Sequence, residues 1–289
     1  MTDATLLHGA CDLHIHFGPD TTPRKMNALE TARAAAAAGM RAILLKCHQS
    51  PTQGVAACAD AAVDGVRVFG GLVLNAAVGG INPAAVKAAC AMGAKQVWMP
   101  TASAEQHLRH FGGAPETAVP VFDSKGRPVP HLEEVLGLIA EADVILGTGH
   151  LSPAESVRIA DLARACGVKK ILVTHPEFEC VAMPTEMQKS LAAKGIFFER
   201  CFYASMSRQG LPVESIAAQI LAVGYESTVL SSDMGQPENP APALALADFL
   251  QRLAACGLPR ERLRRMVCDA PAALLGLEPP CDGAEEARA

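Results

Sequence analysis

The sequence predicts an α/β fold, a (β/α)8 TIM barrel with an inserted loop after the fourth strand. Short apolar segments alternate along the chain with longer, Ala-rich segments, which is the pattern of strands and helices in a parallel sheet. We count eight such strand–helix units, the number that closes a barrel. The length of 289 residues also suits this fold, because single barrels of about 250 residues are common.

The predicted strands are short and apolar, and several predicted helices carry end signals. The strands are expected at residues 11–17, 41–46, 66–74, 95–99, 144–146, 170–173, 196–199 and 228–230. The helices are expected at 27–39, 51–64, 83–93, 131–141, 152–166, 184–194, 212–223 and 240–255. Ser152, Pro153 and Glu155 form a capping box that starts one helix, and Gly39 closes another.

The alternation pauses between residues 101 and 130. Two short apolar runs flank residues 123–126 there, as in a hairpin, and we interpret the segment as a loop inserted within one barrel domain of residues 1–277. The Pro- and Glu-rich segment 278–289 is expected to be a disordered tail. A doubly wound open sheet is the alternative fold, but residues 17–20 are not the glycine-rich phosphate turn that would follow its first strand.

Composition argues against several classes of partner. The net charge is −5 with Lys and Arg scattered, so we expect neither nucleic acid nor an anionic membrane as a partner. The first ten residues are not expected to form a secretory signal, and no apolar run reaches the roughly 20 residues that span a bilayer. Ten cysteines are spread singly, as reduced thiols would be. We expect a cytoplasmic protein with a small-molecule substrate, and the sequence leaves a homo-oligomer open.

Metal-competent residues stand at the C-terminal ends of the predicted strands, where the active site of a barrel lies. His14 and His16 are two apart in the first strand, so their side chains share a face and can converge on one metal ion. The later strand ends supply, in chain order, Lys46 and His48, Asn75, Trp98, His150, His175 and Glu177, Glu199 and Arg200, and Asp233.

This set resembles the amidohydrolase superfamily, metal-dependent hydrolases with His-x-His on strand one, His on strands five and six and Asp on strand eight. The resemblance covers roughly residues 10–276, and residues 269–277 are similar to an Asn-Pro-Ala-x-x-Leu-Gly-Leu segment of many members. It implies a metal-ligand set of His14, His16, His150, His175 and Asp233. It also implies catalytic roles: Asp233 takes a proton from the metal-bound water, and His175 is either a ligand or an acid near that water.

The implied cofactor is a divalent metal, one or two ions, with Zn²⁺ as first choice and Mn²⁺ or Fe²⁺ as alternatives. Neutral imidazoles and a carboxylate leave an open position on zinc, whose bound water has a pKa of about 7. Binuclear members usually carry a carboxylated Lys or a Glu at the end of strand four, but residues 97–100 supply neither. Lys46 could be carboxylated and bridge two metals, or stay an ammonium that holds a substrate carboxylate. We favour the ammonium, and with it one metal.

Several further polar and aromatic residues need an interpretation. His48 faces the same side as Lys46 and is a candidate for substrate contact, while Arg200 is either an anion clamp or part of a rim salt bridge with Glu199. Trp98 and Tyr203 either line the pocket or are simply buried, and Glu177 is expected to orient a loop or a ligand. The remaining histidines are expected to be structural or solvated: His8, His107, His110 and His131.

The leading functional hypothesis is a hydrolase that uses a metal-activated water to cleave an amide, lactam or lactone bond of a small, carboxylated substrate. The alternative enzyme is a mononuclear-zinc, non-oxidative decarboxylase, since some members with this ligand set cleave C–C bonds. A non-catalytic metal- or ligand-binding barrel is the alternative from another class. Only the decarboxylase releases CO₂, so product analysis separates the two enzymes.

Overall fold

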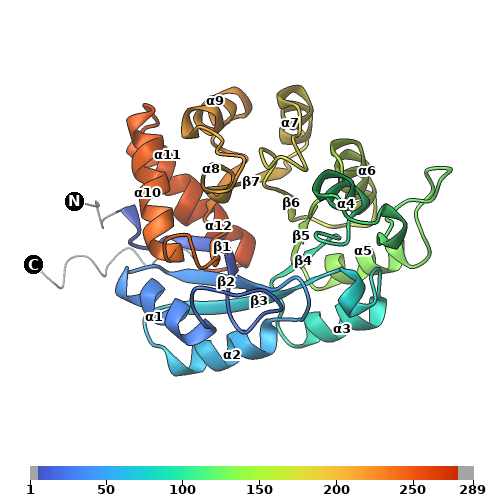
Figure 1. Cartoon of the computed structure of the whole chain (residues 1–289), viewed down its shortest axis with the longest axis horizontal. Helices are drawn as coiled ribbons and strands as arrows, with labels where there is room; N and C mark the ends of the chain where they lie inside the picture. The colour runs from blue at the N-terminus through green and yellow to red at the C-terminus, as the bar shows by residue number, and fades with distance from the viewer. Residues whose placement is uncertain (1–5, 279–289) are drawn as a thin grey trace, which may run out of the picture.

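The structure, a computed structural model, describes residues 6–278, and its strands form one parallel sheet in strict chain order. The sheet nearly closes into a barrel, because the end of the eighth strand meets the first: the amide of Asp233 donates to the carbonyl of His14 (2.9 Å), and the amide of His16 donates to the carbonyl of Met234 (2.8 Å). The predicted barrel is confirmed (Figure 1). The strands are β1 (Cys11–His16), β2 (Ala42–Lys46), β3 (Arg67–Val73), β4 (Gln96–Trp98), β5 (Ile145–Gly147), β6 (Ile171–Thr174), β7 (Phe197–Cys201) and β8 (Thr228–Ser231).

Helices surround the barrel (Figure 1). The longer ones lie within the predicted helical segments, whereas the shorter ones at 105–111, 203–206, 260–264 and 270–275 were not expected. The helices are α1 (Ala28–Ala37), α2 (Gln53–Ala62), α3 (Pro83–Ala91), α4 (Glu105–Phe111), α5 (Leu132–Glu141), α6 (Pro153–Ala165), α7 (Thr185–Ala192), α8 (Tyr203–Met206), α9 (Val213–Val223), α10 (Pro242–Ala255), α11 (Arg260–Arg264) and α12 (Ala270–Leu275). Short turns of 3₁₀-helix lie at Ala76–Val78 and Pro115–Thr117, and a π-helical turn at Arg265–Asp269.

Apolar packing supports the barrel on its outside and in its interior. Two large clusters lie between the sheet and its helices, one on the side of α1, α2, α9 and α10 and the other on the side of α3, α5, α6 and α7. A third cluster fills the barrel, with Leu44, Trp98 and Leu172 from three strands and Leu274 from α12. The polar strand ends therefore rest on a packed apolar floor, as in other barrels of this class.

The segment inserted after β4 is more ordered than a loop. It contains α4, and the expected hairpin is reduced to one antiparallel bridge between Phe122 and Pro128. Helix α4 docks on the segment that follows β6: Gln106 Nε2 donates to the carbonyl of Cys180 (2.8 Å), and His110 Nε2 lies 3.1 Å from Glu179 Oε2. The inserted segment thus belongs to the wall of the strand-end face.

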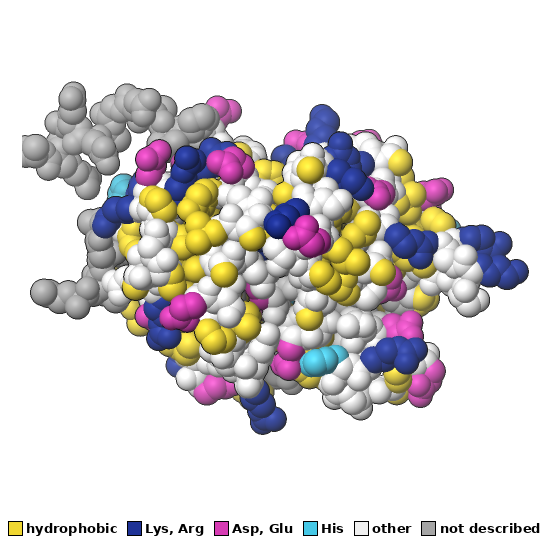
Figure 2. Space-filling model, turned by 90° about the horizontal axis from the view of Figure 1, so that it is seen from above, with side chains coloured by type: hydrophobic (Ala, Val, Ile, Leu, Met, Phe, Trp, Pro, Cys, Tyr) yellow, Lys and Arg dark blue, Asp and Glu magenta, His cyan; other side chains and the backbone are white. Residues whose placement is uncertain are grey.

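The surface agrees with the scattered charges of the sequence. On the face in Figure 2, Lys and Arg side chains lie among Asp and Glu and do not gather into one basic patch. Within residues 6–278, no helix is long and apolar enough to cross a membrane. The tail predicted at 278–289 falls outside the described residues, apart from Glu278.

Candidate metal centre

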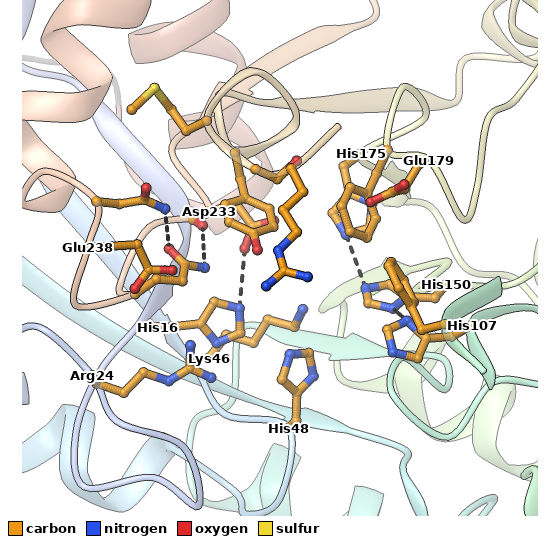
Figure 3. Close-up of a pocket in the computed structure, with 18 residues that line it drawn as sticks. His16, Arg24, Lys46, His48, His107, His150, His175, Glu179, Asp233 and Glu238 are labelled. Carbon is orange, nitrogen blue, oxygen red and sulfur yellow. Dashed lines mark hydrogen bonds and ion pairs between the residues drawn. The ribbon is translucent and has the colours of Figure 1, made fainter. Parts of the chain in front are cut away.

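The C-terminal ends of the strands open into a cavity of about 690 Å³ (Figure 3). Histidines, Lys46 and Asp233 line its polar part. One wall is apolar, formed by Phe111, Phe178 and Tyr203. The lining residues are His16, Arg24, Lys46, His48, His107, Phe111, His150, His175, Phe178, Glu179, Tyr203, Met206, Ser207, Arg208, Asp233, Gln236, Glu238 and Asn239.

The first cluster joins β1 to the end of β8. Asp233 Oδ1 lies 3.1 Å from His14 Nε2 and 3.2 Å from His16 Nε2, and all three side chains are buried. The His-x-His pair therefore converges on the strand-eight carboxylate, as the strand spacing predicts. Figure 3 shows His16 aimed at Asp233.

A β-bulge shapes this cluster, which the regular alternation of the sequence did not predict. The β1–β2 register shifts between Asp12 and Ile15. The Asp12 carboxylate accepts hydrogen bonds from the amides of His14 and Ser232, both at 3.1 Å, so it ties the bulge to β8. Burial raises the pKa of Asp12 to about 7. Bulges commonly re-aim a side chain next to an active site, and Asp12 fixes this one around His14.

Glu199 supports His14 from the other side of its ring. Glu199 Oε2 lies 3.0 Å from His14 Nδ1, and Ser231 Oγ donates to Glu199 Oε1 (3.0 Å). With the Nδ1 proton directed at the carboxylate, the lone pair of His14 is on Nε2, toward Asp233. Burial lowers the pKa of His14 to about 3 and raises that of Glu199 to about 7. His14 is therefore a neutral imidazole, the form that binds metals.

A second cluster lies beside the first, at the ends of β5 and β6. His150 Nε2 is 3.1 Å from His175 Nε2, and the rings of His175 and His14 are 5.8 Å apart. Burial lowers the pKa of His150 well below its ordinary value and that of His175 to about 3. His107 joins this cluster from α4, with its Nδ1 2.8 Å from His150 Nδ1. His150 lies between the other two histidines (Figure 3).

The backbone is shaped to present these groups. Asp233 (φ 54°) and His175 (φ 26°) have left-handed backbone directly after or near a strand end, which costs a non-glycine residue about 1–3 kcal/mol. Gly149 (φ +63°) leads into His150, and a Cβ there would lie 2.4 Å from the carbonyl oxygen of Met99. A side chain is also excluded at Gly235, since a Cβ there would lie 2.2 Å from the carbonyl oxygen of His16. Sharp turns thus place the ligand candidates at the cavity.

Lys46 and His48 enter the cavity from β2 and the loop after it. Lys46 is buried, and its Nζ donates to His14 Nε2 (2.9 Å). Burial lowers the pKa of the Lys46 ammonium. His48 Nδ1 lies 2.8 Å from Thr101 Oγ1, and its ring centroid is 4.8 Å from that of His16. Both side chains therefore reach the first cluster, on the side expected from the sequence.

The donor set fits a divalent metal. Two ligand nitrogens of a tetrahedral zinc ion lie about 3.3 Å apart when each Zn–N bond is about 2.0–2.1 Å. The spacings within the two clusters, 3.1–3.2 Å from Asp233 to the first pair and 3.1 Å between His150 and His175, are close to that value. His14, His16 and Asp233 also form a group whose ligand atoms lie within 4.8 Å of one another. Buried neutral imidazoles with one carboxylate are a preferred zinc environment.

Solved structures with similar folds include an amidohydrolase, an organophosphorus hydrolase and a decarboxylase. An amidohydrolase from Pseudomonas aeruginosa matches with a TM-score of 0.65 and 10% identity over 95% of this chain and 98% of that chain. The organophosphorus hydrolase from Deinococcus radiodurans matches with a TM-score of 0.60 and 16% identity over 94% of each chain. A 2,6-dihydroxybenzoate decarboxylase in complex with 2,6-dihydroxybenzoate matches with a TM-score of 0.57 and 13% identity over 93% of this chain and 100% of that chain. The predicted resemblance to the amidohydrolase superfamily is confirmed in the fold.

Sequence comparison gives a narrower assignment. No curated protein matches the chain. A family of unknown function, DUF6282, matches residues 9–199. The chain belongs to this family. The matched segment of DUF6282 runs from β1 into β7, so it includes His14, His16, His150 and His175 and ends before Asp233.

Arg200 lies apart from the other predicted site residues of this DUF6282 protein. It is buried, does not line the cavity, forms an ion pair with Glu177 and donates to Gln188 Oε1 of α7 (3.0 Å). The reason is the two-residue period of β7: Glu199 faces the barrel interior, so its neighbour faces the helices. Arg200 is therefore not retained as a substrate contact, and Glu177 holds Arg200 instead of a ligand or loop.

Sequence reasoning also missed part of the site. His107 was expected to be structural or solvated, but it lines the cavity against His150, and Asp12 was not singled out at all. Trp98 is fully buried beneath Lys46, with Nζ 5.6 Å from the ring centroid, whereas Tyr203 lines the pocket. The other histidines have surface roles: His110 pairs with Glu179 and His131 with Glu134, while His8 is exposed.

Proposed function

We propose that the protein is a metal-dependent hydrolase that cleaves an amide, lactam or lactone bond of a small anionic substrate. The observation that carries the proposal is the convergence of Asp233 Oδ1 on His14 Nε2 and His16 Nε2, beside the close pair of His150 and His175. These five side chains would hold the metal, Zn²⁺ by preference. A divalent metal held there would supply an activated water as the nucleophile.

Asp233 is the proposed proton carrier. Its Oδ1 faces the two histidines, which leaves Oδ2 on the same carboxylate to take a proton and pass it to the leaving group. The residue is 6% exposed and lines the cavity, so a substrate in the cavity can reach it. His175 takes no proton-transfer role in this arrangement, because its Nε2 is assigned to the metal beside that of His150.

Lys46 needs a different position when a metal is bound. Its Nζ occupies the lone pair of His14 Nε2, the atom that the metal would use, and an ammonium beside a divalent cation is repelled. Lys46 can then turn its ammonium to a substrate anion, with His48 beside it, or become carboxylated and bridge two metals. We propose the first arrangement, and the number of metals per chain decides between them.

Arg208 takes the anion-binding role for which Arg200 had been a candidate. It is exposed, lines the cavity and has no ion-pair partner among the described residues. Arg24, also at the cavity, is held by Asp20 at 2.6 Å. The apolar wall of Phe111 and Phe178 faces the same space. These groups together support a substrate with an apolar body and a carboxylate or similar anionic group.

The decarboxylase is the second candidate, favoured by one observation. Cationic groups, Lys46 and Arg208, line the same cavity as the proposed metal ligands, and a carboxylate can be held there next to the reacting carbon. A similarly folded protein is a 2,6-dihydroxybenzoate decarboxylase. Assay of carboxylated amides, lactams and lactones, with CO₂ measured in parallel, separates the candidates because hydrolysis releases none.

The decisive experiment measures metal per chain by elemental analysis, on protein purified without chelator and with bicarbonate present. We expect about one equivalent, and we expect His16→Ala and Asp233→Asn to lose it. His8→Ala, an exposed histidine, is the matched control and should bind metal like the natural protein. Two equivalents would support bridging by Lys46. Unchanged metal content and ligand binding in both site variants would overturn the proposal in favour of a non-catalytic barrel.

A further inference from the structure

We infer that His107, on the inserted helix α4, is a positioning residue for His150: the contact between their Nδ1 atoms holds His150 in the tautomer whose Nε2 lone pair faces His175 and the cavity. The inference rests on the proposed function, since it takes His150 as a metal ligand. The inserted segment 101–130 would then support a ligand of the metal centre, although the sequence indicated none of its residues as a candidate site residue.

The two ring-nitrogen contacts of His150 differ in length. Its Nδ1 is 2.8 Å from His107 Nδ1, a hydrogen-bond length, whereas its Nε2 is 3.1 Å from His175 Nε2, nearer to the spacing of two ligands on one zinc ion. A hydrogen bond between two imidazoles needs one proton and one lone pair. If the Nε2 lone pair of His150 binds metal, its Nδ1 carries the proton and donates it to the Nδ1 lone pair of His107.

Helix α4 holds His107 in this place. The ring planes of His107 and His150 differ by 30° and their centroids are 4.8 Å apart, an edge-to-edge arrangement that suits a hydrogen bond between the two Nδ1 atoms. On either side along the helix, Gln106 donates to the carbonyl of Cys180 and His110 pairs with Glu179. Phe111 packs on Phe178 at 5.9 Å. Contacts on both sides of His107 therefore fix its ring against His150, which a freely moving loop could not do.

Cys180 offers the competing explanation. Its Sγ is 3.9 Å from His107 Nδ1, and His107, His150 and Cys180 form a group that could hold a metal. A metal bound through the two Nδ1 atoms would have ligand nitrogens 2.8 Å apart, which is short for two zinc ligands, about 3.3 Å apart. The geometry thus favours a hydrogen bond over a shared metal, and a Cys180 variant tests this.

The experiment compares His107→Leu with His107→Asn and measures zinc affinity by chelator competition and zinc content by elemental analysis. Leu removes the acceptor, so we expect one zinc to bind about 10- to 100-fold more weakly. Asn can place Oδ1 where His107 has Nδ1, so affinity should return to within a few-fold of the natural protein. Arg109→Leu, two residues along the same helix with an exposed side chain that pairs with Glu105, is the control and should change affinity little.

The outcomes are distinct. Natural affinity in His107→Leu, with zinc lost in His16→Ala, would overturn the inference and leave the proposed function intact. Zinc retained in His16→Ala would overturn the proposed function itself. If Cys180→Ser loses zinc as His107→Leu does and His107→Asn does not restore it, His107 is a ligand and not a positioning residue. If His107→Leu fails to fold, His107→Asn against Cys180→Ser still decides, since only the positioning role predicts natural affinity in both.

Discussion

His14 has a partner on each ring nitrogen, and the two partners do different things. Its Nε2 faces Asp233 and Lys46, while its Nδ1 lies 3.0 Å from Glu199. A carboxylate that accepts the second proton of a ligand histidine fixes its tautomer and raises its basicity. Glu199 is fully buried in the barrel, so its effect is confined to this contact and to Ser231.

We therefore expect Glu199→Leu to weaken zinc binding about 10- to 100-fold, because the Nδ1 proton of His14 loses its acceptor. Glu199→Gln keeps an acceptor oxygen and should lose much less. Chelator competition measures both, and Glu186→Leu, an exposed glutamate on α7, is the control. Equal zinc affinity in Glu199→Leu and the natural protein would show that Glu199 does not support His14.

Substitution of Arg208, which follows β7, is expected to affect ligand binding, whereas substitution of Arg200, within β7, is expected to affect folding stability. A charge-assisted hydrogen bond contributes about 1.5–3 kcal/mol, and exposure favours the lower end, so Arg208→Ala should weaken binding of phenylacetate about tenfold. Binding of the neutral phenylacetamide should not change.

Arg200→Met removes the partner of buried Glu177 and should instead cost about 3–5 kcal/mol of unfolding free energy.

Titration followed by NMR gives the two dissociation constants, and urea unfolding gives the stability. Arg252→Ala, an exposed arginine on α10, is the control for both measurements. An equal loss of phenylacetate and phenylacetamide binding in Arg208→Ala would mean that Arg208 contributes packing and not charge recognition.

At the scale of elements, the position of His150 depends on the start of α6. Ser152 accepts a hydrogen bond from the amide of Glu155 at the N-terminus of this helix, and the Glu155 carboxylate accepts from the Ser152 amide, so the predicted capping box is present. The cap begins two residues after His150. It therefore anchors the short connection that carries this ligand candidate out of β5.

Ser152→Ala removes the side-chain cap, and we expect it to lower the unfolding free energy by about 1 kcal/mol. Ser152→Asp should restore most of the loss, since aspartate is also a good cap. Urea unfolding of the two variants checks this. A stability unchanged in Ser152→Ala would show that solvent or Pro153 is enough to start the helix.

The elements differ in how much of them the sequence could predict. Alternation, capping residues and terminal glycines are local signals, and they located the eight strands and the longer helices to within a few residues. Helix α4 was missed because it has only 7 residues, and its position is set by contacts with residues 178–180. The bulge at Asp12 was missed because it depends on hydrogen bonds to Ser232, far along the chain.

For the molecule as a whole, barrel topology is what made the candidate site predictable. Eight parallel strands bring their C-terminal ends to one face, so residues at those ends, such as His14, His150 and Asp233, could be grouped before any contact was known. Side-chain direction was less accessible. Because side chains alternate along a strand, the sequence of β7 could have indicated that Glu199 and Arg200 face opposite sides. Nothing local to residue 107, however, indicates that its side chain reaches His150.

The same topology links metal binding to global stability. The proposed ligands come from β1 and from the residues after β5, β6 and β8, so they meet only in the folded chain. A metal that binds the folded state alone adds about 2.7 kcal/mol of unfolding free energy at a concentration one hundred times its Kd. For a protein of this size that corresponds to a rise in Tm of roughly 4–5 °C.

We therefore expect thermal unfolding in excess EDTA to begin several degrees below unfolding in excess Zn²⁺ or Mn²⁺. Asp233→Asn, which removes one ligand charge, should lose most of this difference, and His8→Ala should keep it. Coincident melting curves with and without metal would contradict a metal centre assembled across the barrel. A difference that survives in Asp233→Asn and His16→Ala would place the bound metal elsewhere, with the group of His107, His150 and Cys180 as the next site to test.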